Sequence, residues 1–352
     1  MKKARVLFKN IVKEYTKGIP AVDNVSCTFE PGTLTTLLGP SGCGKTTSLR
    51  LIAGLERATS GKIFIDEKDV TLLPATDRDV TMVFQSYALF PHMSVLENVS
   101  YGLKMAGVTK EEYSEKTIET LKLVGLEGFE QRMPSELSGG QQQRVAVARA
   151  IVLEPKVLLF DEPLSNLDAK LRRQVREDIR NLQQKLGVTT IYVTHDQEEA
   201  LAISDKVIVM NEAVIAQEGN PKNLYNHPNT SFVANFIGDA NIVEATIEKK
   251  TGQDYDIDFG GVKKTISSEF ERTDKISLAL RPETIEINQK KSKNTISAKV
   301  ENVSFVGSQY QYSVSTSLGN MYVVSNETNV YQNINDEVYL SFKDDGISIL
   351  SD

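Results

Sequence analysis

The sequence predicts an α/β fold, with a parallel sheet covered by helices, followed by a small all-β domain. Short apolar runs alternate with amphipathic helices up to about residue 235, and polar–apolar alternation dominates beyond about residue 240. Strands that alternate with helices are typical of a parallel sheet buried on both faces. Alternation with a period of two is typical of half-buried strands. We therefore expect two domains, over residues 1–237 and 238–352.

Composition excludes several classes of protein. The 352 residues are 40% hydrophobic and 25% charged, as in an ordinary globular protein. No run of about 18 apolar residues appears, and the N-terminus is expected to be a first strand rather than a signal peptide. Two cysteines and three histidines form no metal-ligand cluster, which favours a reducing compartment and an oxygen-bound metal such as Mg²⁺. The net charge of −7 argues against a nucleic-acid partner.

The first chemical motif lies between a predicted buried strand over residues 33–39 and a predicted helix over residues 46–56. It matches GxxxxGK[ST] and consists of Gly39, Pro40, Ser41, Gly42, Cys43, Gly44, Lys45, Thr46 and Thr47. Such glycines let backbone N–H groups surround phosphate oxygens, and the helix start adds its positive dipole end. Lys45 is expected to reach the β- and γ-phosphates, and Thr46 to ligate Mg²⁺. A plain glycine turn is the alternative, and the strand–loop–helix context argues against it.

A helical insertion is predicted over residues 86–150, after an apolar strand over residues 80–84. Gln85 ends that strand, where it can contact Mg²⁺ or the attacking water at a hinge. A second glycine loop lies near the end of the insertion, at Ser138, Gly139, Gly140 and Gln141. Ser138 is a good helix N-cap, and the glycines expose backbone N–H groups to an anion. Taken alone, an ordinary capped helix explains this loop as well.

Two further strands end in side chains suited to hydrolysis. Asp161 and Glu162 follow the apolar run 157–160, and His195 follows the run 189–194. Ligands of a parallel sheet bind at the carboxyl ends of its strands. Asp161 is therefore expected to hold Mg²⁺, Glu162 to act as a general base on water, and His195 to contact the γ-phosphate. A solvated strand end and a structural histidine are the alternatives.

The remainder of the first domain adds few chemical groups. A helix is expected over residues 169–186, where apolar residues recur every three or four positions, and a buried strand over residues 206–210. Tyr15 is placed to stack on a nucleobase, although core packing explains it equally well. No segment of the kind that reads guanine is visible, which favours ATP over GTP.

The C-terminal part predicts an antiparallel, barrel-like β domain. The alternating segments are 276–280, 296–300, 310–314 and 338–342. Glycine turns separate strands at residues 259–261 and 318–320. The segment 226–238 is the predicted linker between the domains.

Together these motifs resemble the nucleotide-binding subunit of an ABC transporter. The shared motifs, in order, are the phosphate loop, Gln85, LSGGQ at 137–141, LLFDEP at 158–163, Asp168 and His195. The resemblance covers roughly residues 4–235, and Asn166 departs from the alanine that many members carry. It implies a P-loop NTPase (RecA-like) core with antiparallel β and helical subdomains, and it implies ATP hydrolysis.

The resemblance also implies a site shared between two copies of the chain. A head-to-tail homodimer would enclose two ATP molecules with Mg²⁺, and the signature loop from Ser138 to Gln141 would contact the nucleotide of the partner copy. Tyr15 would stack on adenine, and Asp168 would link the two sites. Gln85 would pass closure to permease subunits in the membrane. Such a subunit lies peripherally on the cytoplasmic face of the inner (plasma) membrane.

The C-terminal part of the chain, from about residue 221, narrows the resemblance to one group of ABC importers. Segments 221–245, 280–287 and 306–314 resemble the linker and the OB-like TOBE module of importers that use an extracytoplasmic solute-binding protein. GDAN at 238–241 and the run 307–310 most resemble the ferric-iron type, with polyamine, phosphonate and sugar-phosphate types close behind. A tail that regulates transport is compatible with each of these. The alternative of another class is a soluble ABC ATPase that acts on nucleic acid or ribosomes, which the single cassette and acidic charge disfavour.

Overall fold

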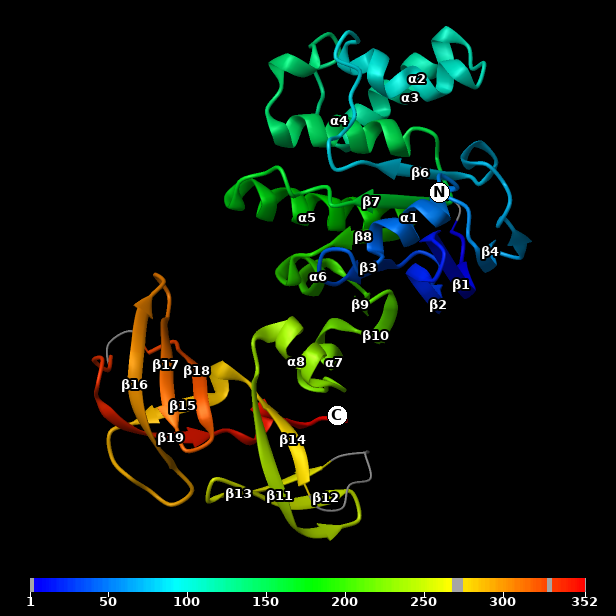
Figure 1. The fold of residues 1–352 in the computed structure, drawn as a ribbon. Coiled ribbons are helices and arrows are strands. Elements are labelled where there is room, and N and C mark those ends of the chain that lie inside the picture. The colour runs from blue at the N-terminus through cyan, green and yellow to red at the C-terminus, as the bar shows by residue number, and fades with distance from the viewer. Residues whose placement is uncertain (1–2, 268–274, 328–330, 352) are drawn as a thin grey trace. The chain divides into compact units, whose positions relative to one another are not determined.

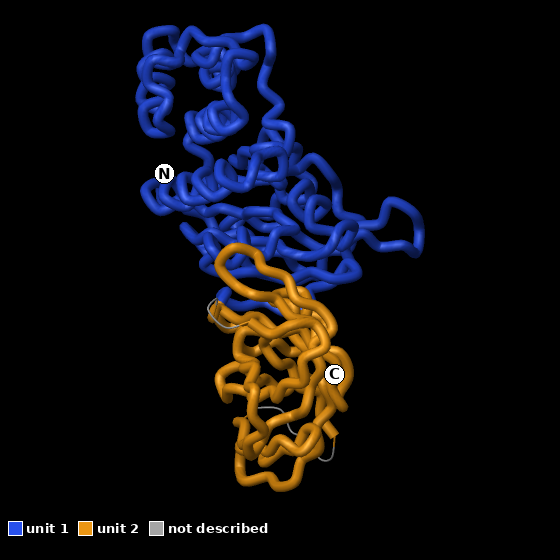
Figure 2. Tube along the Cα trace, turned by 90° about the vertical axis from the view of Figure 1, so that its left-hand side faces the viewer, with its two compact units in different colours: residues 1–221 blue, residues 222–352 orange. Residues whose placement is uncertain are grey.

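The helices and strands divide into two units, residues 1–221 and 222–352 (Figure 2). The computed structural model describes residues 3–267, 275–327 and 331–351. The division falls earlier than the predicted boundary after residue 237, so the second unit takes in nearly all of helix α7 (Pro221–Asn226) and the whole of α8 (Ser231–Gly238). The reason is Arg281, a buried side chain of the second unit that donates hydrogen bonds to the carbonyls of Tyr225 and Ala234.

The core of the first unit is a six-stranded sheet in the order β10-β9-β3-β8-β7-β6 (Figure 1). The strands are β3 (Leu34–Leu38), β6 (Val80–Val83), β7 (Val157–Asp161), β8 (Thr189–Thr194), β9 (Lys206–Asn211) and β10 (Val214–Gly219). All run parallel except β10, which pairs antiparallel to β9. The predicted α/β fold with a parallel sheet is confirmed.

Helices cover both faces of this sheet. They are α1 (Lys45–Ala53), α5 (Ala169–Leu186) and α6 (Gln197–Ile203). Along β7, Val157 and Leu159 belong to the apolar cluster that contains Leu49 of α1, whereas Leu158 and Phe160 belong to the cluster that contains Val175 of α5. Because successive side chains of a strand point to opposite faces, an unbroken apolar run is what a strand buried on both faces requires.

A four-stranded antiparallel sheet, in the order β2-β1-β4-β5, forms part of the first unit. Its strands are β1 (Val6–Thr16), β2 (Ile19–Phe29), β4 (Ser60–Ile65) and β5 (Lys68–Asp69), and the 3₁₀ helix η1 (Ala75–Asp77) follows β5. Arg78, buried just after η1, donates hydrogen bonds to the carbonyls of Leu51 and Ile52 at the C-terminal end of α1. The N–H of Gly54 also donates to the carbonyls of Arg50 and Leu51, so Arg78 and Gly54 together satisfy the last carbonyls of α1.

The segment between β6 and β7 is helical. It holds α2 (Val95–Met105), α3 (Lys110–Leu123), the 3₁₀ helix η2 (Pro134–Glu136) and α4 (Gly139–Ile151). Ser94, Thr109 and Ser138 cap the three α-helices with their hydroxyl groups. Among the described residues, no helix has both the length and the apolar composition needed to cross a membrane.

The second unit contains two five-stranded antiparallel sheets. One has the order β13-β12-β11-β14-β20 and the other β15-β19-β16-β17-β18. The first consists of β11 (Asn241–Thr251), β12 (Asp254–Phe259), β13 (Val262–Ser267), β14 (Lys275–Leu280) and β20 (Ile347–Ile349). The second consists of β15 (Ile285–Asn288), β16 (Ile296–Phe305), β17 (Tyr310–Thr316), β18 (Gly319–Ser325) and β19 (Glu337–Phe342).

The two sheets share one apolar core, in which the rings of Phe259 and Phe342 meet edge to face at 5.2 Å. Two short 3₁₀ helices, η3 (Pro282–Thr284) and η4 (Asp344–Gly346), precede β15 and β20. Sheets that enclose a common core are what the predicted barrel-like β domain requires.

Candidate functional site

The loop from Gly39 to Thr47 joins β3 to α1, and its backbone admits only glycine at two positions. Gly44 has a φ of +101°, and a β-carbon there would lie 2.3 Å from the carbonyl oxygen of Ala21. A β-carbon at Gly39 would lie 2.3 Å from the carbonyl oxygen of Met210. Both distances are too short for any side chain, so the loop in this conformation requires glycine at both positions.

Lys45 lies buried beneath the loop. Its Nζ donates hydrogen bonds to the carbonyl oxygens of Gly39 and Pro40, each at 2.8 Å. Burial raises the pKa of the neighbouring Cys43 thiol, so this thiol is neutral beside the ammonium group. The partners of the ammonium are thus neutral acceptors, and its charge is available to a phosphate group.

Thr46 and Asp161 form a pair suited to a magnesium ion. The Thr46 hydroxyl donates to the Asp161 carboxylate across 3.0 Å, and Asp161 is only 7% exposed. Mg²⁺ prefers oxygen ligands and usually keeps one or two protein ligands alongside phosphate and water. The hydroxyl–carboxylate pair therefore fits an Mg²⁺ ion that is bound together with a nucleotide.

The variant Asp161→Asn is expected to gain stability and lose function. Burial raises the pKa of the Asp161 carboxyl above its value in the unfolded chain. The charged carboxylate therefore destabilises the nucleotide-free fold once the pH has risen through the folded-state pKa. Below the pKa of the unfolded chain this destabilisation is absent. The amide keeps the bond from Thr46, and we expect the free energy of unfolding at pH 7 to rise by about 1 kcal/mol.

Urea unfolding at pH 7 and at pH 5 measures this gain, which should shrink at the lower pH. In the same variant, Mg²⁺ should no longer strengthen ATP binding, as measured by titration with and without the metal. A variant that loses stability, or that keeps the magnesium effect, would contradict the assignment of Asp161.

Glu162 and His195 meet where β7 and β8 end. The Nδ1 atom of His195 lies 3.1 Å from Oε2 of Glu162. Glu162 has a φ of +44°, a conformation that a non-glycine residue rarely adopts, and its N–H donates to the carbonyl of Val193. Backbone strain of this kind occurs at functional sites. In this conformation the Glu162 carboxylate lies at the carboxyl ends of β7 and β8, where the His195 side chain is more than half exposed.

Hydrogen bonds through Ser165 connect Gln85 to Glu162 at the same end of the sheet. Its Nε2 donates to the Ser165 hydroxyl at 3.2 Å, and that hydroxyl donates to the carbonyl of Glu162 at 3.1 Å. Asn166 donates from Nδ2 to the carbonyl of Gln85 at 3.0 Å, a bond that alanine could not make. Ser165 was not predicted from the sequence, because only its position between Glu162 and Asp168 marks it.

The residues of the second glycine loop form the predicted N-cap. Ser138 accepts a bond from the Gln141 N–H, and the Gln141 side chain accepts one from the Ser138 N–H. β-Carbons at Gly139 and Gly140 would meet the side chains of Leu167 and Leu171, at 3.1 Å and 2.9 Å. None of the hydrogen bonds described joins this loop to the phosphate loop, and α4 and α1 belong to the apolar clusters on opposite faces of the sheet.

Two further predicted site residues, Asp168 and Tyr15, take no part in the hydrogen bonds described above. Asp168 caps α5 by accepting a hydrogen bond from the Leu171 N–H at 3.0 Å. Tyr15 is 59% exposed, with the Lys13 ammonium 4.7 Å from its ring centre, so core packing does not explain it. An exposed aromatic ring is available to a nucleobase.

Comparison with known proteins agrees with these motifs. A family model described as "ABC transporter" matches residues 22–165, and one described as "TOBE domain" matches residues 278–350. The "Fe(3+) ions import ATP-binding protein FbpC" of Agrobacterium fabrum is 52% identical over 99% of this chain and 99% of its own. The "Fe(3+) ions import ATP-binding protein FbpC 1" of Haemophilus influenzae is 55% identical over 80% of this chain and 84% of its own.

Solved structures resemble the first unit. The structure of cbiO1 from Clostridium perfringens, described as part of an ABC transporter complex, is 30% identical with a TM-score of 0.59, covering 62% of this chain and 89% of that one. A dimeric post-hydrolysis structure of the ATP-binding cassette MJ0796 with ADP and Pi is 33% identical with a TM-score of 0.55. It covers 61% of this chain and 98% of that one.

Proposed function

Because this chain belongs to the ABC transporter family, we propose that it is the ATP-hydrolysing subunit of an importer whose solute is ferric iron. The observation that carries this proposal is the match to ferric-iron import proteins over nearly the full length of both chains. The match includes the C-terminal unit, where segments 238–241 and 307–310 resemble the ferric-iron type. Import of a polyamine, a phosphonate or a sugar phosphate is the alternative within the family. A role on nucleic acid or ribosomes has no support from these relatives.

The proposed reaction is attack of water on the γ-phosphate of ATP, which forms a bond from the water oxygen to phosphorus, breaks the bond to the oxygen that bridges the β- and γ-phosphates, and releases ADP and phosphate. Lys45 exchanges its two carbonyl partners for phosphate oxygens, and the backbone N–H groups of the loop bind the remaining oxygens. Glu162 accepts the proton of the attacking water, and His195, which lies against the Glu162 carboxylate, contacts the γ-phosphate. Thr46, Asp161 and Gln85 would hold Mg²⁺, which when bound neutralises charge on the phosphates.

We further propose that each site is completed by a second copy of the chain. Ser138, Gly139, Gly140 and Gln141 present a capped helix start that makes no hydrogen bond with its own phosphate loop, and a helix start of this kind binds anions. The dimeric structure of a similar cassette with ADP and Pi supports this arrangement. The dimer would act with permease subunits at the cytoplasmic face of the membrane, and indirectly with an extracytoplasmic solute-binding protein.

Uptake by whole cells tests the solute. Cells that lack this chain are expected to lose uptake of radioactive ferric iron, and the restored wild-type chain should recover it. The Lys45→Ala variant should not recover it, because the phosphate loses its cation. Spermidine and a phosphonate are measured in parallel, and neither should change by more than about twofold. Unchanged iron uptake with lost spermidine or phosphonate uptake would contradict the ferric-iron assignment and leave the ATPase assignment standing.

A further inference from the structure

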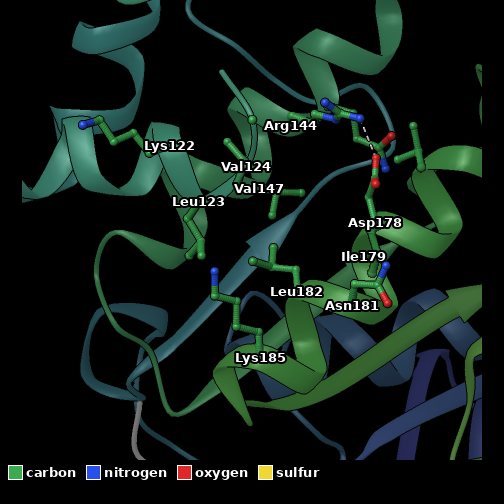
Figure 3. Close-up of a pocket in the computed structure, with 13 residues that line it drawn as sticks. Lys122, Leu123, Val124, Arg144, Val147, Asp178, Ile179, Asn181, Leu182 and Lys185 are labelled. Atoms are coloured by element: carbon green, nitrogen blue, oxygen red, sulfur yellow. Dashed lines mark hydrogen bonds and ion pairs between the residues drawn. The ribbon is translucent and has the colours of Figure 1, made fainter. Parts of the chain in front are cut away.

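A polar cavity of about 90 Å³ lies beside the proposed catalytic groups, at the carboxyl ends of β7 and β8. Glu162, Ser165 and His195 line it, and its other lining residues are also polar or charged. The larger cavity between α4 and α5 differs, because Val147 and Leu182 are among the apolar side chains of its walls (Figure 3). Around the polar cavity, hydrogen bonds and ion pairs therefore set the geometry of the 3.1 Å contact between His195 and Glu162.

Arg172, in the first turn of α5, contacts the residues that follow both strands. Its Nη2 and Nε atoms donate hydrogen bonds to the carbonyls of Leu167 and Leu164, at 3.1 Å and 3.4 Å. Its Nη1 lies 3.7 Å from the carboxylate of Asp196, and its Nε lies 3.8 Å from that of Glu199. A guanidinium group presents five N–H donors in a planar fork, so it can hold several acceptors at once. Arg172 therefore joins the loop after β7 to the residues that follow β8.

Glu199 is a buried carboxylate that orders the backbone on either side of His195. It is 4% exposed, and it accepts hydrogen bonds from the hydroxyl groups of Thr194 and Tyr192, at 2.8 Å and 3.2 Å. Because the Thr194 hydroxyl gives its one proton to the carboxylate, its lone pair is free to accept the N–H of Asp196, at 3.0 Å. Glu199 thus fixes the residue before His195 and the residue after it.

Asp196 connects Arg172 to Glu199 a second time. Its Oδ1 accepts a hydrogen bond from the Glu199 N–H at 3.1 Å and caps α6, while its Oδ2 faces Arg172. The guanidinium, the two carboxylates and the two hydroxyl groups form one connected network, with His195 between two of its members in the chain. In such a network, removal of one member weakens the bonds of the others.

We propose that Arg172 and Glu199 are positioning residues that hold His195 against Glu162. Glu199 sets the backbone around His195, and Arg172 sets the distance between that backbone and the loop that carries Glu162. Loss of either side chain displaces the His195 ring and leaves the phosphate loop unaltered. The effect on turnover rests on the proposed function, whereas the position of the ring does not.

Glutamine variants test the proposal by kinetics. Glu199→Gln and Arg172→Gln are each expected to lower kcat for ATP by about tenfold or more, and to leave KM within about twofold of the wild type. The matched controls are Glu198→Gln and Arg173→Gln, changes at the exposed neighbours in the chain, which should keep both constants within about twofold. Turnover is expressed per ATP bound in an equilibrium titration, so that an unfolded fraction does not count as slow enzyme.

The double variant shows whether the two residues act together. Combining Arg172→Gln with Glu199→Gln should give a kcat within about twofold of the slower single variant, because neither side chain positions His195 without the other. Effects that multiply would show two independent contributions and would overturn the pair.

Stability separates positioning from folding. Burial raises the pKa of the Glu199 carboxyl, so above the pKa of the unfolded chain the charged carboxylate destabilises the fold. The neutral amide of Glu199→Gln lacks this cost, and its urea midpoint at pH 7 should be no lower than that of the wild type although its turnover is slow. A lower midpoint together with slow turnover would assign Glu199 to stability alone.

The position of the ring is measured by NMR on the full chain without ATP. The chain has three histidines, His92, His195 and His227, so with ¹³C-labelled histidine the ring signal that is lost in His195→Asn belongs to His195. This signal should move further in Glu199→Gln than in Glu198→Gln, which removes the same charge from the same helix.

Arg172→Gln should move the same signal, and Arg173→Gln should leave it in place. The proposal is wrong if the His195 signal moves no further in Glu199→Gln and Arg172→Gln than in the two controls, or if either variant keeps the wild-type kcat. A chain that shows these shifts but never hydrolyses ATP would overturn the proposed function and leave the positioning of His195 standing.

Discussion

Replacing Glu162 with glutamine is expected to lower the rate of ATP hydrolysis by about 10²–10⁴-fold while ATP binding persists. The amide has the size of the carboxylate and can still contact His195, but it cannot accept a proton from the attacking water. The unusual backbone at Glu162 is kept, because both side chains have the same shape next to it. Phosphate release measures turnover, and equilibrium titration with ATP measures binding.

The matched control for this prediction is Glu198→Gln. Glu198 is an exposed carboxylate in the first turn of α6, close in sequence to His195. The same chemical change there should leave turnover within about twofold of the wild type. Equal rates of hydrolysis in the Glu162→Gln variant and the wild type would remove Glu162 from the catalytic machinery.

Replacing Ser138 with arginine is expected to abolish ATP-driven dimerisation and turnover, and to leave binding of ATP by the monomer intact. The reason is that none of the described hydrogen bonds joins Ser138 to its own phosphate loop, and that its side chain caps α4 at the surface. A long cation at this position would occupy the space that the nucleotide of the partner copy needs. Light scattering with and without ATP measures the dimer, and phosphate release measures turnover.

Two controls separate the shared site from simple loss of the cap. Ser138→Asn keeps a capping side chain, and comparison of its thermal unfolding with that of Ser138→Arg gives the contribution of the cap, about 1 kcal/mol. A mixture of Ser138→Arg with Lys45→Ala should recover hydrolysis that neither variant shows alone, because one site of the mixed dimer combines two unaltered halves. Normal hydrolysis by Ser138→Arg alone would contradict the shared site.

The parallel sheet was predictable because its strands are short apolar runs bounded by glycine or polar residues. The residues 157–160 show this best, since burial on both faces leaves no polar position within the run. The helix predicted over residues 169–186 has those bounds in the structure, because Asp168 caps its start and Gly187 ends it in a left-handed conformation.

Features that depend on contacts between distant residues were not predictable from local pattern. Ser165 joins Gln85 to Glu162 across a loop, and Arg281 attaches α7 and α8 to the second unit through carbonyls some fifty positions away in the chain. Neither side chain carries a periodic signal, because hydrogen bonds to backbone carbonyls can be made by any suitably placed donor.

The two glycine loops differ in what surrounds them, and this difference bears on their evolution. Gly44 faces the backbone oxygen of Ala21, whereas Gly140 faces the side chain of Leu171. As far as packing within the chain is concerned, a second substitution that shortens Leu171 would make room for a larger residue at Gly140. No substitution at Ala21 moves its carbonyl oxygen out of the way, so a change at Gly44 has no compensating partner there. Packing within the chain therefore excludes a compensated substitution at Gly44 but not at Gly140.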